Sequence, residues 1–404
     1  MNLATLSASY LRARPLQTGL GVLLLALGVG TIVGALLVVS QLESRMGRDA
    51  RGIDLVVGAK GSPMQLILSG IYQLDAPTGN IPLASAQTLA KNPLVKKAMP
   101  LALGDAWRGF RIVGAGREYL EHYGAELAAG RHYGKSMEAV LGADVARRTG
   151  ARVGSRFVGA HGVAGEGEEH TESPYTVVGV LAPTSSVLDR LVLTPIESVW
   201  DVHHHEEKEH QAGHEGREKA EDEDREVTVL LVQYASPLAA ATLPRAINSK
   251  SELQAASPAF EMARLFRIVG TGLEALRAFA AVLILAAGLS VFIALYTELE
   301  ERRYDLAVMR TLGASPARLF GLLFFEGLLL ALLGALGGVL LGHVVAAGLG
   351  VWLAAAEQPA VSGLAFRVEE VWIVAAALAV GAVAALLPAW RAYRTDVSRT
   401  LAQG

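Results

Sequence analysis

The residues of this chain best suited to chemistry are histidines and carboxylates that gather in one polar segment, residues 201–226. Imidazole and carboxylate groups are ligands for Zn²⁺, Ni²⁺ or Cu²⁺. The segment has eleven Asp or Glu, four Lys or Arg and no apolar periodicity, so we expect a disordered loop. It either holds metal, with zinc as the candidate, or is a solvated insertion without a ligand. The candidate metal ligands are His203, His204, His205, His210 and His214.

No pattern typical of an enzyme accompanies these histidines. The H-E-x-x-H spacing of catalytic zinc sites and a nucleophile elbow are missing. The G-A-K-G turn at 58–61 lacks the spacing of a phosphate loop. For residues 52–82 we expect a strand, a turn and a short apolar helix, with a substrate or partner surface as the alternative. Asp189 and Arg190 suggest a local ion pair at a turn. We therefore predict a protein without catalytic residues.

The composition predicts a membrane protein. Of the 404 residues 52% are hydrophobic and 19% charged, which is rare for a soluble domain. A helix needs about 20 apolar residues to cross a bilayer, and four stretches qualify. The first is too long for the core of a signal peptide, so we expect a retained anchor. The predicted spans are residues 19–39, 278–296, 319–353 and 371–387.

Arginines set the orientation, because they concentrate on the cytoplasmic side of membrane helices. They lie before the first span, between the second and third, and after the fourth. We expect both termini in the cytoplasm, and a large domain in the periplasm of an inner membrane. The predicted organisation is 1–43 with the first span, 44–257 as the periplasmic domain, 258–297 as a stalk with the second span, 298–318 as a cytoplasmic segment, 319–353 as the third span, 354–370 as a short periplasmic loop, and 371–404 as the fourth span and tail.

The periplasmic segment mixes strand and helix signals, which predicts an α+β domain. Residues 258–277 carry apolar side chains at three- and four-residue steps, typical of an amphipathic helix. With no proline before the second span, this helix is expected to continue out of the bilayer as a stalk. A separate helix packed on the domain is the alternative. The expected strands are 156–160, 175–182, 190–195 and 226–234, and the expected helices are 85–93 and 236–248.

Two ionisable residues inside the third span need explanation, since such groups are costly in a membrane. Glu326 and His343 are 17 positions apart, or roughly 25 Å along a helix, and cannot pair with each other. We favour a structural hydrogen bond for each over a proton relay. G-x-x-x-G spacings at 334–338 and 338–342 predict close helix packing, within the chain or across a dimer.

The order of spans, together with the segment after the second span, resembles MacB/FtsX/LolC-type (type VII, mechanotransmission) ABC transporter permeases, in a subgroup with a His-rich periplasmic loop. The family pattern R-R-x-[DE]-[LI]-A-x-[ML]-R-x-[LI]-G-A-S occurs at 302–315, and P-A-W-R-A occurs at 388–392. By this resemblance the fold is a membrane protein with four transmembrane helices (1 + 3) and an α+β periplasmic domain. The residues matched for coupling to an ATPase are Arg302, Arg303, Asp305, Met309, Arg310, Leu312, Gly313, Ala314 and Ser315.

The resemblance also implies partners. A separate cytoplasmic ATPase would bind ATP and Mg²⁺, since this chain has no Walker motif, and residues 304–316 would dock on it. A second permease chain would pair with the first, among membrane lipid, and a periplasmic protein or lipoprotein could be acted on. No nucleic acid and no directly bound cofactor are implied. The His-rich loop departs from better-known members and suggests a link to zinc homeostasis. The alternatives are an FtsX-like regulator that does not transport and a metal-responsive membrane protein.

Overall fold

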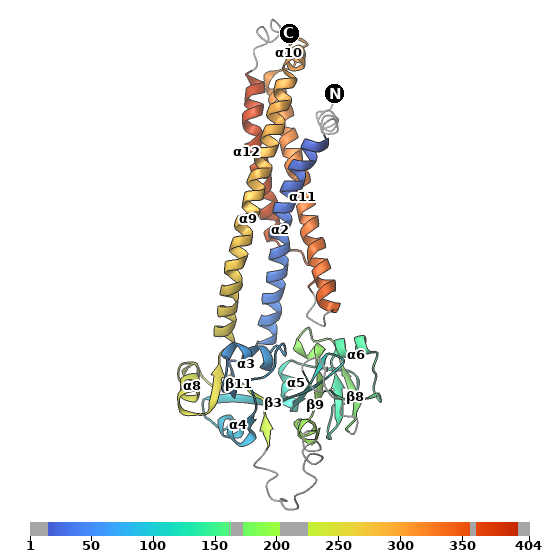
Figure 1. Cartoon of the computed structure of the whole chain (residues 1–404), viewed down its shortest axis with the longest axis vertical. Helices are drawn as coiled ribbons and strands as arrows, with labels where there is room; N and C mark the ends of the chain where they lie inside the picture. The colour runs from blue at the N-terminus through green and yellow to red at the C-terminus, as the bar shows by residue number, and fades with distance from the viewer. Residues whose placement is uncertain (1–14, 161, 163–172, 203–224, 356–360, 395–404) are drawn as a thin grey trace, which may run out of the picture. The chain divides into compact units, whose positions relative to one another are not determined.

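The computed structural model describes residues 15–160, 162, 173–202, 225–355 and 361–394 (Figure 1). Contacts divide the chain into two units. Residues 1–43 and 268–404 form the membrane unit, and Ser44–Arg267 form the domain between the first and second membrane helices.

Four helices of the described chain are long and apolar enough to cross a membrane, which confirms the predicted four spans. Each extends past its predicted span. Exposed aromatic side chains lie near helix ends, at Trp352, Trp372 and Trp390, as in the aromatic belts of membrane proteins. The helices are α2 (Pro15–Asp49), α9 (Pro258–Glu301), α11 (Pro316–Ala355) and α12 (Glu369–Tyr393).

The glycine stripe of α11 packs against α2 of the same chain. A Cβ atom added at Gly338 would lie 2.6 Å from Cβ of Val29, and one added at Gly334 would lie 2.8 Å from Cβ of Leu25. Small residues therefore let the two backbones approach closely. Of the two alternatives that the G-x-x-x-G spacing left open, the structure shows the contact within the chain.

The domain is built on a mixed sheet of ten strands, in the order β12-β1-β11-β3-β4-β9-β6-β8-β5 with β7 beside β8. Strands β2 and β10 form a separate pair. Most neighbours are antiparallel, but β4–β9 and β6–β8 are parallel. The strands are β1 (Leu55–Ala59), β2 (Ile81–Pro82), β3 (Val95–Trp107), β4 (Phe110–Ala115), β5 (Leu127–Gly130), β6 (Glu138–Leu141), β7 (Arg156–Phe157), β8 (Tyr175–Leu181), β9 (Val192–Thr194), β10 (Glu226–Val227), β11 (Val229–Tyr234) and β12 (Leu253–Ala256).

Helices cover this sheet, which confirms the α+β class. The central strands are buried on both faces: Val56 of β1 lies in one apolar cluster while Leu55 and Val57 lie in another. Such strands read as continuous apolar runs. The helices of the domain include α3 (Pro63–Gly70), α4 (Leu83–Ala90), α5 (Arg117–His122), α6 (Ala143–Thr149), α8 (Pro237–Lys250) and the 3₁₀ helix Val187–Arg190.

The core of the domain includes the ends of two membrane helices. Met46 of α2 and Met262 of α9 both belong to its largest buried cluster. The last residue of α2, Asp49, accepts hydrogen bonds from Tyr123 Oη at 2.6 Å through its carbonyl and from Val187 N at 2.9 Å through its carboxylate. The Asp49 carboxylate also lies near Arg190. Burial lowers the pKa of Arg190, whereas the negative charge of Asp49 raises it. Apolar and polar contacts thus fix the end of α2 in the domain.

Residues 52–82 form the predicted strand, turn and short helix. Strand β1 leads through the turn to α3, whose first turn is capped by Ser62 Oγ and begins with Pro63. Thr78 Oγ1 donates to the Ala59 carbonyl at 3.0 Å, and Gly61 leaves room for the Thr78 side chain. The two glycine-containing segments, 58–63 and 77–82, therefore pack on each other. This contact gives the glycine-rich turn a structural role.

The prediction of an ion pair between Asp189 and Arg190 is wrong: among the described residues these two side chains form no ion pair. Asp189 instead accepts hydrogen bonds from Thr184 N and Ser185 N, each at 2.8 Å. Arg190 points to the Tyr72 carbonyl at 3.4 Å. A side-chain carboxylate in a tight turn can accept hydrogen bonds from backbone N–H groups that have no backbone acceptor. Asp189 makes these bonds instead of pairing with the guanidinium of Arg190.

Candidate coupling site

A short helix, α10 (Arg303–Thr311), joins α9 to α11 at one end of the membrane unit. Arg302 separates α9 from α10 with a non-helical backbone (φ −102°, ψ 12°). Gly313 has a φ of +96° and ends α10, since glycine adopts this left-handed conformation without strain. Ser315 and Pro316 then start α11. The sequence L-G-A-S-P thus encodes a helix end and a helix start in five residues.

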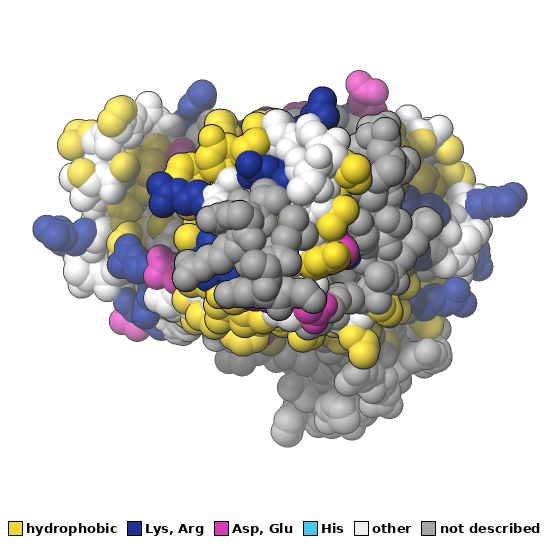
Figure 2. Space-filling view, turned by 90° about the horizontal axis from the view of Figure 1, so that it is seen from above, with side chains coloured by type: hydrophobic (Ala, Val, Ile, Leu, Met, Phe, Trp, Pro, Cys, Tyr) yellow, Lys and Arg dark blue, Asp and Glu magenta, His cyan; other side chains and the backbone are white. Residues whose placement is uncertain are grey.

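One face of α10 is packed and the other is exposed. Leu306 and Ala307 are buried, and Leu306 lies in a cluster with residues of α11 and α12, among them Leu319 and Ala389. Tyr304 is 54% exposed, and Leu312, just after the helix, is 83% exposed. Arg303 and Asp305 are exposed as well. Seen from above in Figure 2, hydrophobic side chains (yellow) and Lys or Arg side chains (dark blue) lie side by side on the visible surface. The exposed face offers apolar and charged groups side by side.

The predicted coupling residues divide between the two faces. Arg303 is exposed and pairs with Glu300 at 2.8 Å, and Asp305 is exposed in the first turn. Met309 packs against the buried cluster that contains Leu306. It therefore holds α10 in place and is not part of the exposed face. Arg310 and Ala314 are half-buried, and Gly313 and Ser315 are exposed.

Glu326 lies 1% exposed on α11, beside Glu298 of α9, which is 8% exposed. Glu298 and Arg302 are the charged side chains near Glu326. Arg302 also forms an ion pair with Glu298. The sequence analysis missed Glu298. Its position four residues before Arg302, a spacing at which helix side chains meet, was the available signal.

His343 forms its own cluster with α12. One ring nitrogen lies 2.7 Å from the Gly363 carbonyl, and the other lies 3.0 Å from Glu370 Oε2. Glu370 is 1% exposed and also accepts from Arg367 N at 2.8 Å. It was expected in the loop 354–370, but α12 begins at Glu369. His343 and Glu326 thus have different neighbours, and no hydrogen bond links the two among the described residues.

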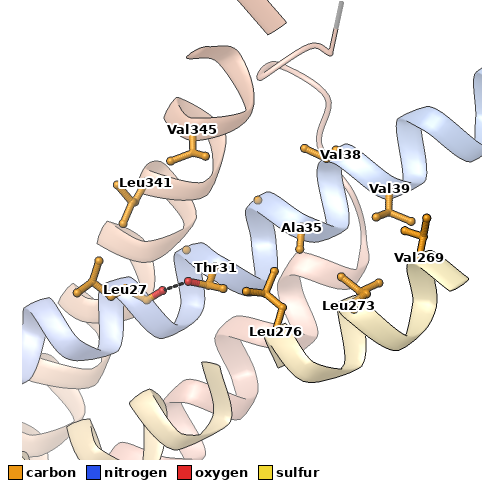
Figure 3. Close-up of a pocket in the computed structure, with 13 residues that line it drawn as sticks. Leu27, Thr31, Ala35, Val38, Val39, Val269, Leu273, Leu276, Leu341 and Val345 are labelled. Atoms are coloured by element: carbon orange, nitrogen blue, oxygen red, sulfur yellow. Dashed lines mark hydrogen bonds between the residues drawn. The ribbon is translucent and has the colours of Figure 1, made fainter. Parts of the chain in front are cut away.

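An apolar groove of 670 Å³ opens among α2, α9 and α11 of the membrane unit (Figure 3). Its one hydroxyl, on Thr31, donates to the Leu27 carbonyl of its own helix at 2.7 Å. The walls therefore offer hydrocarbon and no free polar group for a soluble ligand. They are Leu27, Gly30, Thr31, Gly34, Ala35, Val38, Val39, Val269, Gly272, Leu273, Leu276, Leu341 and Val345.

The candidate metal ligands His203, His204, His205, His210 and His214 lie outside the described residues, and so do His161 and His170. Within the described ranges, no three His, Cys, Asp or Glu side chains come together in a way that could hold a metal ion. The metal hypothesis therefore stays a prediction from the sequence.

Comparison with known proteins supplies the family. Residues 18–250 match the MacB-like periplasmic core domain, and residues 277–397 match the FtsX-like permease C-terminal region. No curated protein matches the chain.

Two solved structures are similar to part of the chain. The periplasmic region of MacB from Actinobacillus actinomycetemcomitans is 15% identical and covers 54% of this chain and 95% of its own, with a TM-score of 0.33. The extracellular domain of the noncanonic ABC-type transporter YknZ from Gram-positive bacteria is 14% identical and covers 50% of this chain and 98% of its own, with a TM-score of 0.28. Because the two family matches together cover most of its length, the chain belongs to the FtsX-like ABC transporter permeases that carry a MacB-like periplasmic core domain.

Proposed function

We propose that the chain is the permease subunit of an ABC transporter complex and transmits ATP-driven motion from a separate cytoplasmic ATPase to the periplasmic domain. The observation that supports this most is the continuity of α9. Its 44 residues run without interruption from Pro258 to Glu301. One end contributes Met262 to the core of the domain, and the other is one residue from α10.

A helix of this kind suits mechanical transmission. Every turn is closed by backbone hydrogen bonds along the axis, and α9 has no internal proline. A displacement of α10 therefore reaches the domain through one rigid element. Helix α2 offers a second route, because its far end is also held in the domain core by Met46 and Asp49.

The exposed face of α10 is the proposed ATPase contact. With the termini and α10 in the cytoplasm, as the arginines imply, Tyr304 and Leu312 face water unless a partner covers them. An exposed apolar residue rimmed by charges is typical of a protein interface. Hydrolysis of ATP would occur on the partner, and this chain would perform no catalysis. For the substrate that the domain would extract or export, the family resemblance suggests a lipoprotein, a peptide or a metal-linked substrate.

Leu312→Asp is expected to weaken binding of the ATPase about tenfold or more, because a charge would replace an apolar contact at the centre of the interface. The measurement is the ATPase activity that co-purifies with the tagged permease from native membranes. Leu364→Asp is the matched control, since Leu364 is 95% exposed in the loop between α11 and α12, at the opposite end of those helices. Equal ATPase yield from the two variants would refute the docking assignment.

We also propose that the loop 201–226 binds a divalent metal, with zinc as the test ion. The support is the sequence: five histidines among carboxylates, in a chain without cysteine. Calorimetry of the full chain with Zn²⁺ should show binding that weakens as the pH falls through about 6.5, where histidine protonates. Replacing His203, His204, His205, His210 and His214 by asparagine should abolish that heat. Unchanged affinity in this variant would exclude the loop as the site.

A further inference from the structure

The contacts of His343 fix a hydrogen on one nitrogen of its ring. Nδ1 lies 2.7 Å from the carbonyl oxygen of Gly363. A carbonyl oxygen can only accept a hydrogen bond, so Nδ1 is the donor. The loop approaches α11 closely here: a Cβ atom added at Gly363 would lie 2.5 Å from the His343 carbonyl oxygen. In a neutral ring with its hydrogen on Nδ1, the other nitrogen, Nε2, is an acceptor.

Nε2 nevertheless faces a second acceptor. It lies 3.0 Å from Oε2 of Glu370, and Oε1 of the same carboxylate accepts from Arg367 N at 2.8 Å. Glu370 stands in the first turn of α12, where the helix dipole stabilises an ionised carboxylate. Because two acceptors at this distance repel each other, Nε2 must also carry a hydrogen, which makes the ring an imidazolium. The ring of Phe366 stacks on it with the centroids 5.6 Å apart, and an aromatic face attracts a cation.

The same cluster ties the loop between α11 and α12 to α2. Among the described residues, Glu370 is the ionisable group in contact with the His343 ring, and Arg367 is the other charged residue of the cluster. The guanidinium of Arg367 is directed to α2, where its Nε donates to Ser40 Oγ at 3.1 Å. Gln41 of α2 exchanges two hydrogen bonds with the backbone of Ser362, at 2.9 and 2.8 Å. The loop therefore lies between two helices, and His343 is its contact with α11.

We propose that His343 and Glu370 form a proton-binding site that holds the α11–α12 loop in place at the end of α11 away from α10. The bound form is an imidazolium between the Gly363 carbonyl and ionised Glu370. Loss of the proton from Nε2 would leave a lone pair facing the buried carboxylate, and an unpaired buried charge is strongly unfavourable. The loop and the start of α12 would then detach from α11. The site uses this chain alone, so its failure and that of the proposed ATPase contact are separate results.

Nitrogen NMR of the full-length permease in lipid nanodiscs, with isotope-labelled histidine, tests the charge of the ring. A neutral imidazole has one nitrogen without hydrogen, which gives a signal separate from those of an imidazolium. The spectrum of the wild type minus that of His343→Gln isolates this residue among ten histidines. At about pH 7.5 an unpaired histidine is mostly neutral, but His343 is expected to be an imidazolium. A neutral ring would overturn the proposal.

Glu370→Gln removes the need for the proton and keeps the hydrogen bonds. The glutamine amide can donate to Nε2 of a neutral ring and accept from Arg367 N, so the variant should fold, and its His343 should be neutral. The folded wild type binds a proton that the unfolded chain releases, so its extra stability is present in acid and is lost as the pH rises. Between about pH 6 and pH 9, its thermal midpoint in detergent should therefore fall by about 3 °C relative to Glu370→Gln.

His122→Gln is the control for the thermal measurement. His122 is also partly buried, but its Nε2 lies 2.9 Å from the Arg51 carbonyl and does not face a carboxylate. This variant should keep the pH dependence of the wild type. If the midpoints of the wild type and Glu370→Gln change in parallel with pH, the pair does not bind a proton that stabilises the fold, and the proposal is wrong.

Discussion

Replacing Gly338 by leucine should separate α2 from α11 and leave little folded permease in the membrane. A Cβ atom at this position would lie 2.6 Å from Cβ of Val29 and 2.9 Å from the Ala26 carbonyl oxygen. The Ala26 carbonyl oxygen belongs to the backbone, which cannot move aside as the end of a flexible side chain can. Overpacking at such a contact costs about 3 kcal/mol, a large part of the stability of a domain. The measurements are the monodisperse yield and the thermal midpoint in detergent.

Gly348→Leu is the matched control for this substitution. Gly348 lies on the same helix, and no atom that would obstruct an added Cβ lies within 4 Å of that position. It should retain the yield and thermal midpoint of the wild type. If Gly338→Leu behaves like Gly348→Leu, then α11 does not pack on α2 through the glycine stripe, and the stripe must serve another contact such as a second chain.

Thr271→Pro in α9 should uncouple the periplasmic domain from the ATPase without disturbing either. Proline removes a backbone hydrogen bond and kinks the helix, at a cost of about 3 kcal/mol, at a point between the domain and the membrane span. Since α10 is left intact, the variant should still bind the ATPase and support hydrolysis. Motion of α10 would then bend α9 at the kink instead of displacing the domain.

A fluorophore on the domain measures this uncoupling. The chain has no cysteine, so Leu238→Cys, at a position 63% exposed on α8, gives one labelling site. In the complex of the ATPase with a labelled permease whose α9 is unchanged, addition of ATP should change the fluorescence of the label. Thr271→Ala is the control: the Thr271 hydroxyl bonds only the Ile268 carbonyl of its own helix, and the ATP response should persist. A full response in Thr271→Pro would show that α2, or another route, carries the motion.

Local patterns were enough to predict the helices of the membrane unit. Long apolar runs gave all four spans because a membrane helix satisfies its own backbone hydrogen bonds and has to be apolar over its length. The continuity of α9 followed from apolar spacing and the lack of proline. The end of α10 and the start of α11 are encoded in Gly313, Ser315 and Pro316, whose preferences are local.

The sheet was predicted less completely. The strand expected within 52–82 is β1, and the strand signals at 156–160, 175–182, 190–195 and 226–234 correspond to β7 to β11. The ten-stranded sheet also contains β3, β4, β5, β6 and β12, which were not predicted. The long strand β3 includes Lys96, Lys97 and Pro100, and a shift of register lies between Leu103 and Ala106. Its place between β11 and β4 depends on residues more than one hundred positions away, which no local window contains.

What the sequence alone determined is the set of elements and their order: four spans, an external α+β domain, and a short charged helix between the second and third spans. Only the tertiary structure decided which residues meet. It placed Gly338 against Val29, Glu326 near Glu298, and His343 on Glu370. The physical reason is the range of the forces involved. Hydropathy and helix capping act within a few residues, whereas the partner of a buried charge or a glycine is set by the packing of helices that are distant in the chain.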